Sequence, residues 1–151
     1  MIEISTYKEE YSNAFKDLNM AWLQKYFIPE PYDVEVLSNP KKYIIDKGGA
    51  IYFVLENNIP VGTVALMYNN YGELEFTKMA VDESAQGKGF GKLLMNCCIE
   101  NAIKMEAKEL ILYSNTKLTT AIQLYIKSGF IEIPVGSSAY ERCNIKMSKK
   151  L

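Results

Sequence analysis

Apolar residues in the first third of the chain recur every three or four positions, a spacing typical of a helix. The pattern predicts a helix over residues 8–27, with a short strand over residues 2–6 before it. The apolar positions of this helix are Tyr11, Phe15, Leu18, Trp22, Leu23 and Tyr26. Two prolines in the sequence IPEPYD end the pattern and predict a polar, acidic connection. A second, short helix is predicted over residues 39–49, with Pro40 near its first turn and its end at Gly48.

The middle of the chain changes to the period of β-strands and then returns to that of helices. Three β-rich segments, 50–56, 61–68 and 73–82, are separated by the turn sequences NNIP and NNYG. A helical face then runs from Phe90 to about Lys104. The last predicted elements are a buried strand over 110–114, a helix from Leu118 that stops at Ser128–Gly129, and strands over 130–133 and 140–148. We therefore expect an α/β fold with a mixed α+β sheet, and we expect residues 1–151 to form a single domain.

The composition is that of a globular protein in water, with 48% apolar and 23% charged residues. No apolar run has the length of a membrane span, and the N-terminal sequence MIEISTYKEE lacks the features of a signal peptide. We therefore expect a cytoplasmic protein with no membrane partner. The 17 basic and 18 acidic residues give a net charge of -1, which argues against nucleic acid as a partner.

The chain contains no histidine, and this absence removes several classes of enzyme. Ser-His and Cys-His nucleophiles, HExxH metalloproteases and His-ligated zinc enzymes are excluded. The three cysteines lack the spacing of a zinc site or of a disulfide framework, and Cys97 and Cys98 fit small core residues of a helix. We expect no metal, so acid–base chemistry must use Glu, Asp, Tyr, Lys, Cys or water.

A glycine-rich turn, QGKGFG at Gln86–Gly91, follows the third β-rich segment and opens the helix after it. The first turn of a helix exposes backbone N–H groups and the positive end of the helix dipole, which together bind anions. Glycines keep the approach to these donors open, and Gln86, Lys88 and Lys92 can add polar and cationic contacts. The alternative is a flexible turn without a ligand. A Walker A lysine and the GxGxxG spacing are both absent, which disfavours a nucleotide-binding domain.

This turn resembles the Q/R-x-x-G-x-G/A pyrophosphate loop of the GNAT superfamily of acyl-CoA-dependent N-acyltransferases. A second segment, NTKLTTAIQLYIKSGF at Asn115–Phe130, is similar to the fourth-helix motif of that family. The order of elements also matches from Ile2 to Met147. The resemblance implies the GNAT fold: a strand, two helices, three strands, a helix, a strand, a helix and two strands. It further implies that the strands ending at Val81 and Ser114 splay apart, and that acetyl-CoA is the co-substrate.

The same resemblance places the cofactor on particular residues. Its pyrophosphate would bind the glycine turn, and its pantetheine arm would enter between the two splayed strands. The backbone N–H of Met79 would point at the thioester carbonyl, where negative charge develops during attack. For Asn115 the alternative role is that of a helix cap. The positions that match the family's cofactor contacts are Met79, Ala80, Val81, Gln86, Gly87, Lys88, Gly89, Phe90, Gly91, Lys92 and Asn115.

Proton transfer needs two further groups, because a lysine-type amine with a pKa of about 10.4 is mostly protonated at neutral pH. Glu75 lies at the distance before the glycine turn where several relatives carry a catalytic glutamate, so it is the candidate base. Glu73, on the same strand face, and water are the alternatives, and Glu75 could also be a solvent-facing strand residue. Tyr125 matches the family tyrosine that protonates the departing thiolate, and its alternative role is that of an aromatic core residue.

The early acidic connection is the candidate acceptor side. Glu30, Asp33 and Glu35 would suit a cationic amine, although acids in loops are often only solvated. The aromatic residues that could line the same site are Trp22, Tyr26, Phe27 and Tyr32. We expect an N-acetyltransferase that transfers the acetyl group of acetyl-CoA directly to a primary amine of a small molecule or peptide. A non-catalytic acyl-CoA-binding module is the alternative, and the sequence is compatible with a homodimer.

Overall fold

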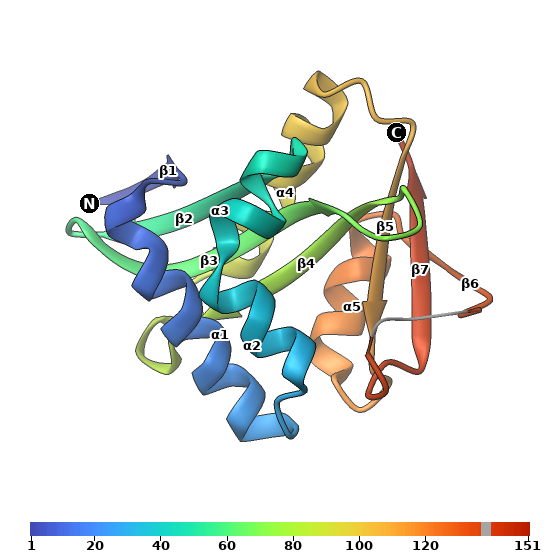
Figure 1. Ribbon diagram of the computed structural model, residues 1–151, viewed down its shortest axis with the longest axis horizontal. Coiled ribbons are helices and arrows are strands. Elements are labelled where there is room, and N and C mark those ends of the chain that lie inside the picture. The colour runs from blue at the N-terminus through green and yellow to red at the C-terminus, as the bar shows by residue number, and fades with distance from the viewer. Residues whose placement is uncertain (137–139) are drawn as a thin grey trace.

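The computed structural model describes residues 1–136 and 140–151, which form a seven-stranded mixed sheet between two layers of helices (Figure 1). The strands lie in the order β1-β2-β3-β4-β5-β7-β6. Neighbouring strands are antiparallel except β4 and β5, which are parallel. The strands are β1 (Ile2–Thr6), β2 (Ala50–Glu56), β3 (Ile59–Tyr68), β4 (Leu74–Val81), β5 (Glu109–Ser114), β6 (Ile131–Ile133) and β7 (Ile145–Lys150). This mixed sheet confirms the predicted fold class.

The helices cover both faces of the sheet and create two hydrophobic cores. The first three helices pack over Ile51 and Phe53 of β2, and the last two pack over Tyr52 and Val54. Side chains alternate between the faces of a strand, which separates the two cores. In the described part of the chain, no helix combines the length and apolar composition that crossing a bilayer requires. The helices are α1 (Ser12–Tyr26), α2 (Pro31–Ser38), α3 (Pro40–Tyr43), α4 (Phe90–Lys104) and α5 (Thr119–Lys127), with short 3-10 turns η1 (Glu9–Tyr11), η2 (Ile45–Lys47) and η3 (Glu83–Ala85).

The helix α2 corrects the prediction of a connection in the IPEPYD segment. Pro31 occupies the first turn of the helix, where its missing N–H would have had no helical partner. Glu30 and Asp33 form a capping box, in which the Glu30 N–H donates to Asp33 Oδ2 at 2.8 Å. The helix is only 8 residues long, so its apolar period is too short to stand out beside the two prolines.

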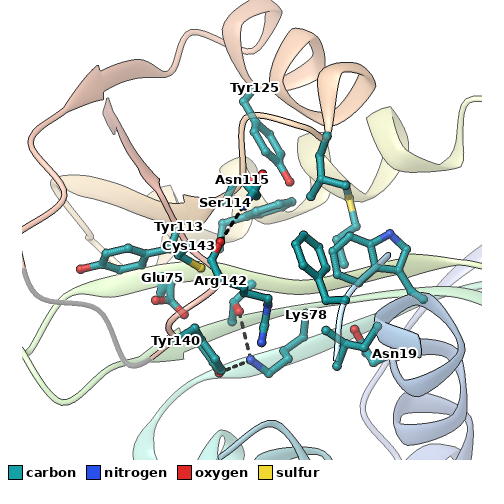
Figure 2. Close-up of a pocket in the computed structure, with 17 residues that line it drawn as sticks. Asn19, Glu75, Lys78, Tyr113, Ser114, Asn115, Tyr125, Tyr140, Arg142 and Cys143 are labelled. Carbon is teal, nitrogen blue, oxygen red and sulfur yellow. Dashed lines mark hydrogen bonds between the residues drawn. The ribbon is translucent and has the colours of Figure 1, made fainter. Parts of the chain in front are cut away.

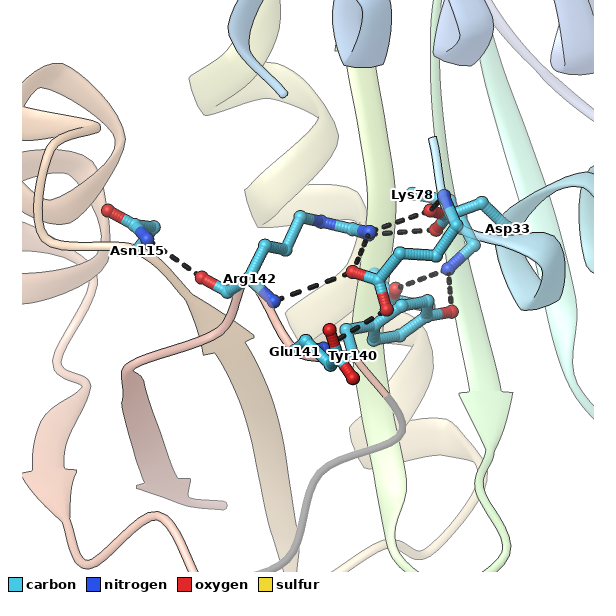
Figure 3. Close-up of polar contacts among 8 residues, drawn as sticks. Asp33, Lys78, Asn115, Tyr140, Glu141 and Arg142 are labelled. Carbon is cyan, nitrogen blue, oxygen red and sulfur yellow. Dashed lines mark hydrogen bonds and ion pairs between the residues drawn. The ribbon is translucent and has the colours of Figure 1, made fainter. Parts of the chain in front are cut away.

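The strand predicted over residues 140–148 is shorter than expected. It begins at Ile145, and residues 140–144 form an irregular turn. Within this turn the Cys143 N–H donates to the Tyr140 carbonyl at 3.4 Å. The turn carries the side chains of Tyr140 and Arg142 toward α2, where they contact Tyr32 and Asp33 (Figure 3).

The parallel strands β4 and β5 separate toward their carboxyl ends, as the family resemblance implied. They are in register at one position, Glu75 opposite Ile111. The strand β4 also contains a bulge, because Val64 of β3 faces two residues of β4, Lys78 and Met79. Lys78 adopts a left-handed φ of 58°, which is uncommon for a residue with a side chain.

Candidate active site

A pocket opens where β4 and β5 separate (Figure 2). Glu75 and Lys78 enter it from β4, Tyr125 from α5, and Tyr140 and Arg142 from the turn before β7. The fold thus gathers three charged and two phenolic side chains from distant parts of the sequence. Such a convergence of polar groups in one pocket is typical of a reactive site.

Glu75 is a buried carboxylate, with 4% of its surface exposed. Burial raises its pKa above the ordinary 4.5, although the Lys78 charge and hydrogen bonds from Asn69 and Thr77 act to lower it. A general base works best when its pKa approaches the working pH. The raised pKa therefore moves Glu75 toward the range that suits a base.

Glu73, the alternative base, is held in a different set of contacts. Its carboxylate accepts hydrogen bonds from Tyr113 Oη at 3.0 Å, Asn69 Nδ2 at 3.0 Å and Lys146 Nζ at 2.8 Å. Burial acts to raise its pKa, but these bonds outweigh burial and lower it. Glu73 does not line the pocket. The geometry therefore favours Glu75 over Glu73 as the base.

Tyr125 lies both in the hydrophobic core and at the pocket. Its ring packs edge-on against Phe76 and Phe130, at centroid distances of 6.0 and 6.2 Å, and belongs to the core. Its hydroxyl points into the pocket (Figure 2). Burial, together with the nearby Cys143 thiol, raises its pKa to about 12. The phenol is therefore protonated at neutral pH and available as a hydrogen-bond donor.

A groove along the glycine turn joins this pocket. Both share Trp22, Met79 and Leu118, so a ligand on the turn can extend into the pocket. Gly87 and Gly89 have φ values of 81° and 82°, and a Cβ on either would contact no other protein atom. The space next to the first turn of α4 is therefore open to a ligand. The predicted cofactor residues that line the groove are Met79, Ala80, Val81, Gln86, Gly87, Gly89, Phe90, Gly91 and Lys92.

Two of the predicted cofactor residues lie outside this groove. Lys88 forms an ion pair with Glu56, with its Nζ 3.0 Å from the carboxylate. Asn115 lies at the pocket, where its side chain donates to the Arg142 carbonyl at 2.7 Å and accepts from the Lys117 N–H at 2.9 Å. The Asn115 amide thus ties the turn before β7 to the end of β5.

The early acids, predicted to face a cationic acceptor, form contacts within the protein, as Figure 3 shows for Asp33. Asp33 is completely buried, and Arg142 donates to both of its oxygens, at 2.7 and 2.8 Å. Glu30 accepts from Arg142 Nη1 at 3.1 Å, and Glu35 accepts from Tyr43 Oη at 2.8 Å. Arg142 therefore pairs with both Asp33 and Glu30.

The candidate aromatic residues divide between the two cavities. Trp22 and Phe27 line the pocket, and Tyr26 lines the groove. Tyr32 packs on Tyr140, with ring centroids 5.5 Å apart, and borders a smaller recess that also reaches Glu75. Aromatic side chains thus line the cavities that reach the buried Glu75 carboxylate.

Sequence reasoning missed Lys78, Tyr140 and Arg142. The Lys78 ammonium hydrogen-bonds the Tyr140 hydroxyl and lies 4.4 Å from the centroid of its ring. Burial lowers the pKa of Lys78, partly opposed by the charge of Glu75, and burial raises the pKa of Tyr140. The one available signal was a lone lysine inside the apolar strand sequence FTKMAV.

Comparison with known proteins shows the family. A family model described as an acetyltransferase (GNAT) domain matches residues 47–132. The uncharacterized N-acetyltransferase YvbK of Bacillus subtilis strain 168 is 33% identical over 104 residues, which are 67% of each chain. A GNAT acetyltransferase from Staphylococcus aureus Mu50 superposes with a TM-score of 0.89 at 20% identity, covering 99% of both chains. A PaiA N-acetyltransferase from Thermoplasma acidophilum, in complex with coenzyme A, has a TM-score of 0.76 at 17% identity, covering 100% of this chain and 99% of its own. The chain therefore belongs to the GNAT family, as an acetyl-CoA-dependent acyltransferase.

Proposed function

We propose that the protein transfers the acetyl group of acetyl-CoA directly to a primary amine, with Glu75 as the base and Tyr125 as the acid. The observation that carries this proposal is the single pocket into which both side chains point, joined to the groove of the glycine turn. The acceptor is the amine of a small molecule or peptide. The amine attacks the thioester directly, without a covalent acyl-enzyme.

The cofactor fits the groove by chemistry. Its pyrophosphate would accept hydrogen bonds from the free N–H groups of the first turn of α4, next to Gly89 and Gly91. Its pantetheine arm would lie between β4 and β5, where the backbones are too far apart to pair. Met79 lies in the bulge, outside the regular register with β3. Its N–H would stabilise the negative charge on the thioester oxygen during attack.

The reaction begins with loss of a proton from the acceptor ammonium to Glu75. Without a base, the small neutral fraction of a lysine-type amine at pH 7 would add about 4.6 kcal/mol to the activation free energy, from about 3.4 pH units at 1.36 kcal/mol each. The neutral amine then attacks the thioester carbon, so a C–N bond forms and the C–S bond breaks. The Tyr125 hydroxyl hydrogen-bonds the departing sulfur and supplies the proton that converts the thiolate to a thiol. The second proton, which the amine nitrogen loses as the amide forms, restores the Tyr125 phenol.

The first experiment compares Glu75→Gln with Glu73→Gln, using turnover of acetyl-CoA with a panel of amines. Glu75→Gln should lower kcat/KM by about 10²-fold and leave the Kd of acetyl-CoA unchanged, because only the base is removed. In the wild type, the raised pKa of Glu75 places the acidic limb of the pH–rate profile above pH 4.5. That limb should disappear in Glu75→Gln, and the defect should shrink as pH rises.

Glu73→Gln is the matched control, since it makes the same chemical change on the same strand segment outside the pocket. Its pH–rate profile should keep the wild-type acidic limb. A wild-type rate and profile in Glu75→Gln would reject Glu75 as the base. Binding of acetyl-CoA with no turnover for any amine would instead favour a non-catalytic acyl-CoA-binding module.

A further inference from the structure

Glu75 and Lys78 carry opposite charges into the same pocket, although they are three positions apart on one strand. In a regular strand, residues three apart point to opposite faces of the sheet. The bulge changes this arrangement, because Lys78 has a φ of 58° and shares its place opposite Val64 with Met79. A left-handed conformation at a residue with a side chain is energetically unfavourable and is often found at functional sites. Here its result is a carboxylate and an ammonium that face one cavity (Figure 2).

The Lys78 ammonium has no carboxylate partner of its own. It hydrogen-bonds the Tyr140 hydroxyl and lies over the Tyr140 ring. Among the described residues, no carboxylate, including that of Glu75, comes within ion-pair distance of its Nζ. The other cation at the pocket, Arg142, is fully matched by Asp33 and Glu30. Lys78 is therefore the cation that the pocket leaves available to a ligand.

Separated opposite charges in one pocket are matched by a ligand that carries both charges in the reverse order. An ammonium group beside Glu75 and a carboxylate group beside Lys78 would satisfy each side chain with a charge-assisted hydrogen bond. A polyamine would place a second cation near Lys78, where like charges repel. The pattern of charge thus distinguishes between classes of amine.

We propose that the acceptor is an amine that carries a nearby carboxylate, an α-amino acid in the simplest case, and that Lys78 binds this carboxylate. This inference rests on the proposed acetyltransferase function. The acceptor ammonium gives its proton to Glu75, and the amine then forms the amide bond as the thioester C–S bond breaks. The acceptor carboxylate stays on Lys78 and Tyr140 throughout, so these residues set specificity and exchange no proton with the reacting atoms.

The test measures kcat/KM for free α-amino acids and for their carboxamides, which keep the amine and the side chain but lose the negative charge. The wild type should prefer the acids by about 10- to 100-fold, the range expected for one hydrogen-bonded ion pair. Lys78→Met keeps the length of the side chain and removes its charge. This variant should bring the acid-to-carboxamide ratio close to one, mainly through a higher KM for the acids.

Lys146→Met is the matched control, because Lys146 pairs with Glu73 outside the pocket. It should keep the wild-type ratio. Equal or better use of carboxamides or polyamines by the wild type would overturn the inference, whether or not Lys78→Met folds. An unchanged ratio in Lys78→Met, or acetylation of Lys78 itself found by peptide mapping, would also overturn it. If no amine of any class is acetylated, the proposed function fails first.

Discussion

Burial shifts the pKa of the two proposed catalytic groups in directions that suit their roles. It raises the pKa of Glu75 toward neutrality, and it raises that of Tyr125 to about 12. The shifts have the same physical cause, because loss of water disfavours the charged form of an acid. For Glu75 the result is a stronger base, and for Tyr125 it is a phenol that stays protonated until sulfur becomes negative.

At the residue scale, Tyr125→Phe separates an enzyme from a binding module. The variant keeps the ring that packs on Phe76 and Phe130, so the melting temperature should change little. It loses only the hydroxyl that points into the pocket. We expect kcat to fall by about 10- to 10³-fold, since one positioned donor contributes up to about 4 kcal/mol. The Kd of acetyl-CoA should stay within a few-fold, because the hydroxyl acts mainly when charge develops on sulfur.

Tyr52→Phe is the control for this change. Tyr52 is buried to a similar extent, and burial also raises its pKa to about 12, but it lies away from the pocket. Tyr52→Phe also removes one buried hydroxyl, but it should leave kcat at the wild-type value. Normal turnover with lost stability in Tyr125→Phe would show that Tyr125 acts only as a core residue.

At the scale of elements, we propose that the glycine turn and α4 form one anion-binding unit. The helix begins at Phe90, directly after Gly89, which is in the left-handed region. This conformation turns the chain into the helix and leaves the first N–H groups facing the groove. The backbone needs the left-handed φ at Gly89 to enter the helix, whereas a bound ligand would need the open space beside it.

A pair of glycine substitutions distinguishes these two requirements. Gly89 and Gly72 have φ values of 82° and 77°, and a Cβ on either would contact nothing in the protein. Gly89→Ala and Gly72→Ala should therefore lower the unfolding free energy by similar amounts, about 1 kcal/mol. Only Gly89→Ala should weaken coenzyme A binding, by about tenfold or more in calorimetry. Equal affinity in the two folded variants would show that the turn binds no pyrophosphate.

Most elements follow from local pattern, and the exceptions depend on contacts made far along the chain. The helix α4 and the strands β2 to β5 repeat their apolar period long enough to be predicted. The helix α2 escaped prediction because it is short and is stabilised by its capping box and by Arg142, which lies 109 residues beyond Asp33. The turn before β7 resembled a strand because nothing local shows that Arg142 is bound to α2.

The site shows the same division between local and distant information. Tyr125 and the glycine turn lie in motifs that resemble those of the family, and Glu75 lies at a family spacing before that turn, so the sequence could propose them. Lys78 reaches the pocket only through a bulge, and a lysine gives no local signal for a left-handed φ. The early acids were assigned to the acceptor because their net charge was visible, whereas the cation that compensates them was not.

At the scale of the whole molecule, the separation of β4 and β5 divides the sheet into two halves, β1 to β4 and β5 to β7, with little strand pairing between them. The sheet joins β4 to β5 in register at one position, and contacts beside the pocket add further links. The main one is the ion pair between Arg142, before β7, and Asp33 on α2, in which Asp33 has no exposed surface. Lys117 Nζ also donates to the Tyr26 carbonyl, at 2.6 Å, across the groove. These links hold the two halves together where β4 and β5 separate, at the proposed cofactor site.

The last prediction tests the ion pair as a structural link. Arg142→Met would leave the Asp33 carboxylate buried without its partner, and breaking a buried pair in this way costs about 3–5 kcal/mol. We expect denaturant unfolding to show a loss of this size. Adding Asp33→Asn to Arg142→Met should recover much of it, because the Asn oxygen still accepts the Glu30 N–H and the completely buried carboxylate is gone. Lys41→Met, which breaks an exposed pair with Asp46, should hardly move the unfolding midpoint. If Arg142→Met behaves like Lys41→Met, or if the double variant is no more stable than the single one, the two halves are held together by other contacts.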